Sequence, residues 1–589
     1  MPLPKTVRAL PVTLNIRRRV DLTPSQLSDS IPPLLQRIYR ARDIRCDEDI
    51  ETSLSGLLSP AQLKGLPEAV TLLADHVVAA KRLLVVGDFD CDGATSSALA
   101  VSCLRAMGAH SVDFLVPNRF EYGYGLTPEI VAVASQQRPD LIITVDNGIS
   151  SISGVAAAQQ AGIKVLVTDH HLPGHELPAA EAIVNPNQPG CSFASKNLAG
   201  VGVIFYVMSG LRAELRRRGW FAERAIAEPN MADVLDLVAL GTVADVVALD
   251  KNNRILVEQG LRRMRAGRVR PGIKALLEIA NRRLDRLVSA DLGFAAGPRL
   301  NAAGRLDDMS LGIQCLLATD EYQAREMATQ MDELNQDRKS IETSMQREAL
   351  QSLEQLDLSE ADEMPWGLCI YQAEWHQGVI GILASRIKDR YHRPVIAFAD
   401  SDNGEEIKGS ARSIQGLHIR DALDAVASKH PGLLTKFGGH AMAAGMSLKK
   451  TDYSAFSQAF DQEVRRQLSV DDLQAVYLSD GELAKQDFNL SLAQMLRDAG
   501  PWGQHFPEPV FDGEFYLIGQ RIVGEKHLKM VLAPLDDRQQ LIDAIAFNVD
   551  IKNWPNTAAE QVQLVYKLDV NEFRGNKTVQ LLVDQIAAL

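Results

Sequence analysis

Short apolar runs alternate with helix-like stretches between residues 70 and 190. Stretches with helical spacing, such as Thr95–Met107 and Ser153–Ala161, separate most of these runs. Strands that alternate with helices predict an α/β fold with a doubly wound parallel sheet. Such sheets bind their ligands at the carboxyl ends of the strands. The predicted strands are Leu83–Val86, Val112–Val116, Leu141–Val145, Val165–Val167 and Ala182–Val184.

The pattern changes three times further along the chain. Residues 231–320 are mainly helical in pattern, and residues 320–358 carry many charges without glycine or proline, which predicts one long helix or two. A second α/β region follows, with strands at Gly367–Tyr371 and Val395–Ala399. The tail begins as helix and continues in five strand-like runs, which fit an OB-like barrel or another small β domain. These runs are Val510–Ile518, Leu528–Leu532, Ile542–Phe547, Val562–Leu568 and Thr578–Val583.

These changes divide the chain into five segments. We expect an N-terminal extension (1–70), a first α/β domain (71–318), a long connecting helix (319–362), a second α/β domain (363–450) and a helical lead-in with a β-barrel module (451–589).

Composition narrows the class of protein only a little. A hydrophobic content of 46% and a charged content of 23% are ordinary for a soluble globular protein. The net charge of −13 lacks the basic footprint of many nucleic-acid binders, although it leaves room for a local basic groove. The six cysteines form no CxxC pair, which argues against a zinc ribbon or a disulfide framework. With no signal peptide and no apolar run of ~18 residues, we expect a cytoplasmic protein without a membrane span.

Three carboxylates follow the first strand at alternate positions. Asp88, Asp90 and Asp92 come directly after Leu83–Val86 and before a helical pattern. In extended backbone alternate side chains point to one side, so these carboxylates would converge and repel one another unless a cation joins them. The alternative is a solvated acidic loop that caps the next helix.

Two later strands and one apolar run also deliver acids. Asp146 and Asp169 each follow a predicted strand, and Asp169 is followed by His170 and His171. Asp245 is the single carboxylate of the run Leu240–Val247, where it is costly to bury unless it is paired or binds a metal. Each residue alone has a structural alternative: a helix cap, a hydrogen-bonded histidine pair or an ion pair with arginine. Acids occur at four corresponding positions of the predicted fold. It is therefore less favoured that the structural alternatives hold at all four positions at once.

The combination of ligands suggests the kind of metal site. Carboxylates with histidine suit Mn²⁺ or Mg²⁺ better than structural zinc, which favours cysteine. Two ions ~3.5–4 Å apart, bridged by one carboxylate, activate water and stabilise the leaving oxygen in phosphoester hydrolysis. The sequence therefore predicts a two-metal phosphoesterase.

These motifs resemble a known family. The groups Asp88-x-Asp90-x-Asp92, Asp146-Asn147-Gly148, Asp169-His170-His171 and Asp245 resemble the four motifs of the DHH phosphoesterases. The stretches Trp375–Gly381 and Lys436–His440 resemble the associated C-terminal DHHA1 domain, and Pro298–Arg305 resembles a motif of the family's single-strand exonucleases. The long helix and the β-rich tail also match, so the resemblance covers nearly the whole chain.

The resemblance implies a role for each motif residue. Asp90, Asp92, Asp146, His170 and Asp245 are expected to hold two Mn²⁺ or Mg²⁺ ions, with Asp146 as the bridge and Asp88 within or just behind this shell. His171 is expected to face the scissile phosphate and to stabilise developing charge. The catalytic group implied is therefore His171, Asp146 and Asp88.

Further residues are candidates for holding DNA. In Pro117–Gly125, Arg119 and Tyr124 suit phosphate contact and base stacking, with a plain turn as the alternative. Ser410 and Arg412 offer a hydroxyl and a guanidinium two residues apart, which suits a terminal phosphate. With Arg305 they are expected to form a pocket for a 5′ phosphate, as the resemblance implies. The remaining candidates are Arg299, Asn301, His376 and His440, of which the two histidines are either substrate contacts or supports of the fold.

The resemblance implies a metal-dependent exonuclease that degrades single-stranded DNA from its 5′ end and releases mononucleotides, with a role in DNA repair and recombination. A single-strand-binding protein is the expected partner. The rival hypotheses are a DHH phosphoesterase acting on short RNA, cyclic dinucleotides or pyrophosphate, and a non-catalytic replication scaffold. The first rival is usually shorter and lacks a β-rich tail, and the second is expected to have lost metal ligands, all of which are present in this sequence.

Overall fold

The computed structural model describes residues 14–20, 24–117, 125–355, 364–401, 404–551, 553–573 and 575–589. The chain forms two compact units. Unit 1 comprises residues 1–332 and 477–589, and unit 2 comprises residues 333–476. Unit 2 is therefore inserted, in sequence, between two parts of unit 1.

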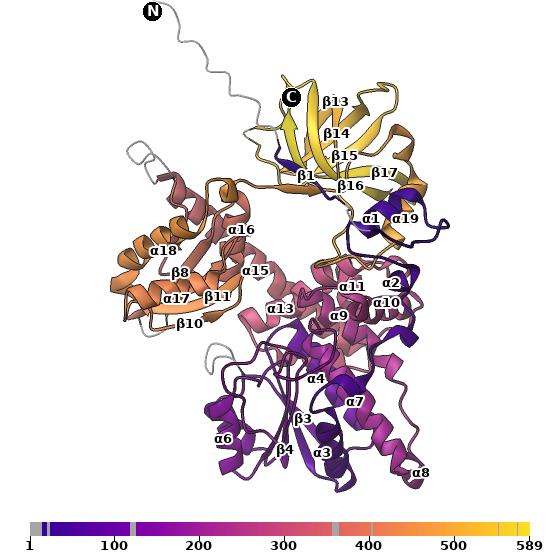
Figure 1. The fold of residues 1–589 in the computed structure, drawn as a ribbon, viewed down its shortest axis with the longest axis vertical. Helices are drawn as coiled ribbons and strands as arrows, with labels where there is room; N and C mark the ends of the chain where they lie inside the picture. Colours follow the sequence, from indigo (N-terminus) through magenta and orange to yellow (C-terminus); the bar gives the residue numbers. More distant parts are fainter. Residues whose placement is uncertain are drawn as a thin grey trace, which may run out of the picture. The chain divides into compact units, whose positions relative to one another are not determined.

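A five-stranded parallel sheet is the centre of the first part of unit 1 (Figure 1). Its strand order is β3-β2-β4-β5-β6, which confirms the predicted doubly wound sheet. Alternate residues such as Leu84 and Val86 pack against α5 and α6, while α4, α7 and α3 pack together as a second group. The strands are β2 (Arg82–Gly87), β3 (Ser111–Leu115), β4 (Leu141–Val145), β5 (Lys164–Thr168) and β6 (Ala182–Val184). The helices are α3 (Leu66–Val78), α4 (Cys91–Ala106), α5 (Pro128–Ser135), α6 (Ile152–Gln160) and α7 (Gly200–Arg217).

The predicted helical region after the sheet is confirmed. Within it a single π-helical turn, Leu292–Ala296, leads directly into α13 (Gly297–Leu306). The other α-helices of this region are α9 (Leu235–Ala244), α10 (Lys251–Arg265), α11 (Pro271–Ile279), α12 (Ser289–Asp291) and α14 (Ser310–Leu317), and the short helix α8 (Trp220–Arg224) precedes it. One continuous helix, α15 (Glu321–Gln355), follows, so the described part of the charged segment forms one helix rather than two.

Unit 2 contains a mixed sheet of five strands in the order β10-β11-β9-β8-β7. Only β7 (Leu368–Tyr371) and β8 (Val395–Asp400) correspond to predicted strands, and they pair in parallel. The three further strands are β9 (Glu406–Arg412), β10 (Lys436–Gly439) and β11 (Ala443–Lys449). Their neighbours are α16 (Ile380–Tyr391), α17 (Ile419–Lys429) and α18 (Tyr453–Gln467).

The C-terminal part of unit 1 is a closed five-stranded barrel, which confirms the predicted OB-like module. Strands β15 and β17 pair in parallel and the other neighbours pair antiparallel. The barrel strands are β13 (Phe511–Val523), β14 (His527–Pro534), β15 (Ile542–Ala546), β16 (Gln561–Phe573) and β17 (Asn576–Ala588).

The N-terminal segment is tied to the approach to the barrel. Strand β1 (Ile16–Arg18) pairs in parallel with β12 (Tyr477–Ser479). Short helices α1 (Pro33–Arg40) and α2 (Asp47–Ile50) follow β1, and α19 (Leu490–Asp498) precedes the barrel. Contacts between residues more than 400 positions apart therefore close unit 1.

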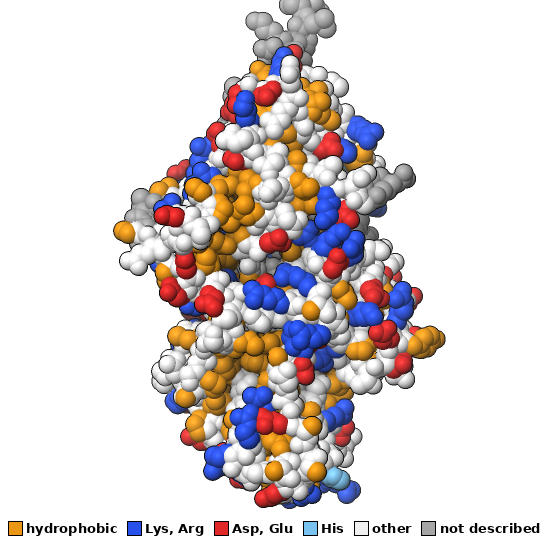
Figure 2. Space-filling view, turned by 90° about the vertical axis from the view of Figure 1, so that its right-hand side faces the viewer, with side chains coloured by type: hydrophobic (Ala, Val, Ile, Leu, Met, Phe, Trp, Pro, Cys, Tyr) orange, Lys and Arg blue, Asp and Glu red, His pale blue; other side chains and the backbone are white. Residues whose placement is uncertain are grey.

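The surface carries both signs of charge. On the face shown in Figure 2, acidic and basic side chains are interspersed, and Lys and Arg side chains gather near mid-height. Among the helices that the structure describes, none is both long and apolar enough to cross a membrane.

Candidate metal centre

The first three acids lie where β2 ends and α4 begins. Asp90 is the N-cap of α4, and its Oδ1 accepts hydrogen bonds from Asp92 N (2.9 Å) and Gly93 N (3.0 Å). Asp92 lies in the first helical turn, so the expectation that all three acids share one extended stretch is wrong. The chain turns into helix at Cys91, two residues earlier than alternation requires. Capping and metal binding are therefore compatible at Asp90, because the cap uses backbone donors on one side of the carboxylate.

The N-terminus of α7 stabilises Asp92 from the opposite side. Gly200 N donates to Asp92 Oδ2 (2.6 Å) and Val201 N donates to Asp92 Oδ1 (2.9 Å). The first amides of a helix are unsatisfied donors that favour an anion. A Cβ atom on Gly200 would lie 2.7 Å from Asp146 Cβ, so only glycine allows α7 to approach this closely.

Asp146 follows β4 in a left-handed backbone conformation with φ of 61°. The next residue fixes this turn, because Asn147 Nδ2 donates to Val86 O (3.0 Å) and Val145 O (2.9 Å). These bonds join the ends of β2 and β4. The turn places Asp146 Oδ1 3.1 Å from His170 Nε2.

Asp169 organises the two histidines rather than joining the cluster of ligands. Its Oδ1 accepts from His170 N (2.7 Å), His171 N (3.1 Å) and His171 Nδ1 (2.7 Å), and its Oδ2 accepts from Ile149 N (2.9 Å). Burial alone would raise the pKa of Asp169, but the hydrogen bond and charge of His171 hold it below its usual range. Burial lowers the pKa of His171, and the contact with Asp169 outweighs this and raises it to about 9.

Asp245 ends α9 and reaches the same place. Its Oδ2 is buried and accepts no hydrogen bond from any residue that the structure describes, while His170 Nε2 lies 3.5 Å away. Val246 follows with φ of 61°, an unusual conformation for a β-branched residue.

The donor atoms fall into three overlapping groups in which all atoms lie within 4.8 Å of one another. The groups are Asp88, Asp90 and Asp146; Asp92, His170 and Asp245; and Asp146, His170 and His171. Asp146 and His170 each belong to two groups. Of the two, Asp146 carries a carboxylate, whose two oxygens allow it to bind two ions at once. The structure thus brings together all six predicted ligands and His171.

The electrostatics of the cluster fit divalent cations. Burial and the charge of Asp90 raise the pKa of Asp92 to about 7. Burial and the charges of Asp92 and Asp90 raise the pKa values of Asp146 and Asp245 well above their usual range. Buried carboxylates that repel one another are relieved by a hard cation with oxygen and nitrogen ligands.

Helix α13 supports the metal loop. Asn301 Oδ1 accepts from Cys91 N (2.7 Å), between Asp90 and Asp92. Arg299 Nη1 donates to Ala295 O (2.7 Å), and its Nη2 lies 2.8 Å from Asp332 Oδ1. Arg305 lies in the last turn of the helix. Two of the DNA-binding candidates on this helix, Asn301 and Arg299, therefore also make contacts within unit 1.

The substrate candidates of unit 2 lie around β9 and the start of α16. Arg412 Nη1 donates to Ser410 Oγ (3.1 Å), and a Cβ atom on Gly381 would lie 2.9 Å from each of these side chains. His376 Nδ1 accepts from Gly378 N (3.1 Å), just before α16. His440 precedes β11, in which Ala443 pairs with Arg412.

Two predicted DNA contacts, Arg119 and Tyr124, lie outside the described residues.

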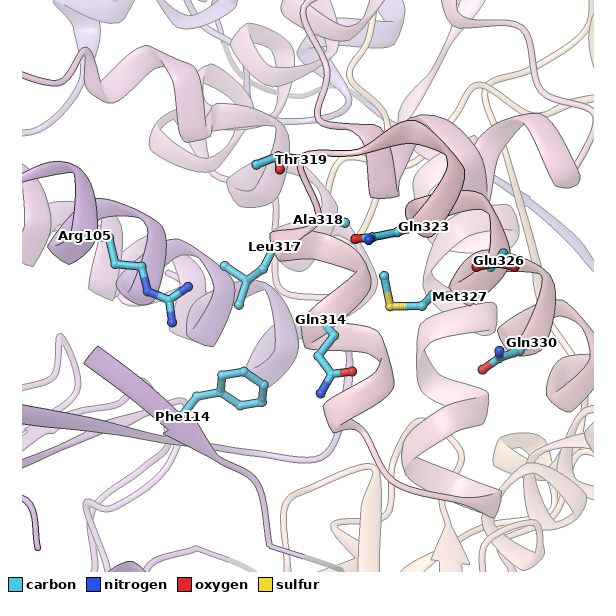
Figure 3. A pocket seen from close by; sticks show the side chains of 10 residues that line it. All are labelled: Arg105, Phe114, Gln314, Leu317, Ala318, Thr319, Gln323, Glu326, Met327 and Gln330. Carbon is cyan, nitrogen blue, oxygen red and sulfur yellow. The ribbon is translucent and has the colours of Figure 1, made fainter. Parts of the chain in front are cut away.

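A separate pocket of about 560 Å³ lies at the far end of α4 (Figure 3). Its side chains include Arg105, Phe114 and Met327. Arg105 is about 22 Å along the helix from Asp90, so this pocket does not form the metal centre.

The supporting roles of three residues were not predicted from the sequence. Asp169 was singled out as part of the Asp-His-His triplet and Asn301 as a DNA contact, and the structure shows that both also hold neighbouring parts of the metal cluster in place. Gly200, whose N–H donates to Asp92, was not singled out at all.

A parallel sheet with carboxylates and histidines gathered near its carboxyl edge, close enough together to hold metal ions, is the arrangement expected of the DHH class. Residues 82–242 match the DHH family N-terminal domain, residues 367–466 the DHHA1 domain and residues 479–585 the RecJ OB domain. The chain is 57% identical over 98% of its length to the single-stranded-DNA-specific exonuclease RecJ of Dickeya dadantii, of which it covers 99%. It is 56% identical to the RecJ of Escherichia coli, covering 97% of this chain and 98% of that one.

A solved structure agrees with these relatives. The crystal structure of RecJ from Thermus thermophilus in complex with Mn²⁺ matches with a TM-score of 0.76 at 28% identity, covering 95% of this chain and 76% of that chain. The chain belongs to the RecJ family.

Proposed function

We propose that this protein is a metal-dependent exonuclease specific for single-stranded DNA, which acts from the 5′ end and releases 5′ mononucleotides in DNA repair and recombination. The observation that carries this proposal is the cluster of Asp88, Asp90, Asp92, Asp146, His170 and Asp245 at one sheet edge. The relatives that share nearly the whole chain are named single-stranded-DNA-specific exonucleases.

The cluster would hold two Mn²⁺ or Mg²⁺ ions, with Asp146 between them. When bound, such ions make water a stronger nucleophile and neutralise charge on the phosphate. The chain's own contribution is to fix the ligands: α7 orients Asp92, the Asn147 amide sets the turn at Asp146, and Asn301 positions the loop at Cys91.

His171 faces the reacting phosphate in this proposal. Asp169 accepts its Nδ1 hydrogen, so the ring presents Nε2 and keeps a positive charge available as the phosphorane-like transition state gains negative charge. No serine or cysteine nucleophile is needed.

The pair Ser410 and Arg412 is proposed to bind the terminal 5′ phosphate, with His376 and His440 beside it. Burial lowers the pKa of Arg412, and no acidic side chain among the described residues counteracts this effect. A guanidinium without a carboxylate partner, beside the first turn of α16, suits an incoming phosphate. Arg119, Tyr124, Arg299, Asn301 and Arg305 remain proposed contacts of the strand.

Three further proposals accompany this function. A single-strand-binding protein is the proposed partner, the cytoplasm is the proposed compartment, and the five-segment division at residues 70, 318, 362 and 450 is the proposed domain organisation. The scaffold hypothesis is disfavoured because every ligand is present, and the short-substrate hypothesis because the chain carries the barrel.

The test uses one oligonucleotide labelled at either end, with and without a 5′ phosphate, in Mn²⁺, Mg²⁺ or EDTA. We expect immediate release of mononucleotides from the 5′ label, lost in EDTA and in the Asp146→Ala variant. Release from the 3′ label first would refute the polarity and the phosphate pocket. Binding without cleavage in either metal would favour the scaffold hypothesis.

A further inference from the structure

Three large apolar side chains are exposed on segments that lead to the metal cluster. Phe294 is 83% exposed, Val246 63% and Leu172 62%. Single exposed apolar residues are ordinary on protein surfaces. These three are notable because Leu172 and Val246 each follow a cluster residue in the chain, and Phe294 belongs to a turn that packs on the helix preceding Asp245.

Leu172 and Val246 are connected to the cluster by the chain itself. Leu172 follows His171, whose carbonyl accepts from Asn185 Nδ2 (2.9 Å), and Val246 follows Asp245. His170 Nε2 lies 3.5 Å from Asp245 Oδ2, so the two segments meet at the metal centre.

The turn that carries Phe294 packs against the end of α9. A Cβ atom on Gly293 would lie 3.2 Å from Val243 Cγ1, and one on Gly297 would lie 3.2 Å from Ala244 Cβ. The π-helical turn therefore rests on the last turn of α9, immediately before Asp245, and Phe294 projects from it into solvent.

The backbone at these positions is unusual. Val246 has φ of 61°, a left-handed conformation that is strained for a β-branched residue. Phe294 lies in a π-helical turn, a feature that is frequent at functional sites. Arg299 braces that turn by donating to Ala295 O. Exposed valine and phenylalanine in such conformations indicate a ligand rather than a contribution to the core.

We propose that Phe294, flanked by Val246 and Leu172, is the platform on which a nucleobase next to the scissile phosphate stacks. This inference rests on the proposed function. A nucleotide carries a charged phosphate next to a flat base. The proposed site offers a metal cluster for the phosphate and exposed apolar side chains for the base. The platform side chains carry no hydrogen-bonding group, so they accept all four bases, as an exonuclease that removes every nucleotide requires.

The test is a double-mutant cycle that removes the Phe294 ring, one nucleobase of the substrate, or both. The substrates are 5′-phosphorylated oligothymidylates with one tetrahydrofuran abasic residue at position 1, 2 or 3. For the wild type we expect kcat/KM to fall about 5- to 150-fold when one of these positions lacks its base. On intact DNA, the kcat/KM of Phe294→Ala should be lower than that of the wild type by the same factor. On the abasic substrate that affects the wild type, the kcat/KM of Phe294→Ala should fall no further.

Matched variants separate stacking from other effects. Phe294→Trp should retain wild-type kcat/KM and base dependence. Tyr322→Ala removes another exposed aromatic ring, 70% exposed at the start of α15, and should behave as wild type. Because Phe294 is exposed, its substitution should leave the unfolding midpoint unchanged.

Two outcomes would overturn the platform. One is Phe294→Ala with wild-type kcat/KM on intact DNA, and the other is equal base dependence in Phe294→Ala and wild type at all three positions. Failure of the proposed function is distinguishable, because the wild type would then cleave none of the substrates.

Discussion

Asp169 is the residue through which the histidine pair is positioned, since one carboxylate receives three backbone N–H groups and the ring of His171. We predict that Asp169→Asn lowers kcat/KM about 10- to 100-fold, the usual cost of losing a residue that orients a metal-site ligand. The amide nitrogen of asparagine cannot accept hydrogen bonds, so one set of donors loses its acceptor. Steady-state cleavage of a labelled oligonucleotide measures the effect.

Asp140→Asn is the matched control. Asp140 accepts from Arg82 N (2.8 Å) at the amino end of β4, the opposite edge of the same sheet. It should leave kcat/KM unchanged. Similar losses in both variants would show that the effect at Asp169 is general damage to the sheet.

At this scale the positions of the proposed ligands were predictable and most of the contacts that support them were not. Asp88 and Asp146 follow apolar runs directly, and this local signal places them at a strand end. Asn301 contacts Cys91 across 210 residues of sequence, and Gly200 matters only because α7 approaches Asp146. Such contacts depend on tertiary packing that local sequence does not encode.

Buried ion pairs join elements that are distant in sequence. Arg42, just after α1, donates to Asp480, just after β12, at 2.8 and 2.9 Å, and both side chains are buried. We predict that Arg42→Leu lowers the free energy of unfolding by about 3 kcal/mol, because Asp480 would keep a buried charge with Arg19 as its one remaining ionic partner among the described residues. Chemical denaturation of the whole protein, followed through the unfolding transition of unit 1, measures this change.

The double variant Arg42→Leu with Asp480→Leu should be more stable than Arg42→Leu alone, since the isolated charge is gone. Arg217→Ala, which removes a surface ion pair with Glu214, should leave the unfolding midpoint unchanged. A double variant no more stable than the single variant would show that packing, and not the charge, accounts for the loss.

The strands differ in how well their hydrophobic pattern predicts them from the sequence. Strands β2 and β4 are continuous apolar runs buried on both faces, and they were predicted nearly to the residue. Strand β9 alternates buried and half-buried positions with glycine and alanine in its sequence, a weak signal that was missed. The pairing of β1 with β12 joins residues about 460 positions apart, which no local pattern reveals.

At the scale of the whole molecule, every proposed metal ligand lies between residues 88 and 245 and therefore in unit 1. A ligand stabilises only the cooperative unit that binds it, and one bound ion adds about 2.7 kcal/mol at a hundredfold excess over its Kd. We predict that Mn²⁺ slows hydrogen exchange in unit 1 and leaves unit 2 unchanged. The barrel strands β16 and β17 should share this protection although they lie more than 300 residues from the ligands, because they belong to unit 1.

Hydrogen exchange with mass spectrometry, with and without Mn²⁺, measures this prediction. In β4 and β16, the amides that exchange only when the whole unit unfolds should exchange up to about a hundredfold more slowly with Mn²⁺. The exchange rates of peptides from α17 and α18 should stay the same. Asp146→Asn is the control, because it should abolish the protection while the fold persists. Equal protection of α17 and α18 would show that the two units unfold together, and protection of β4 without β16 would show that the barrel is a separate cooperative unit.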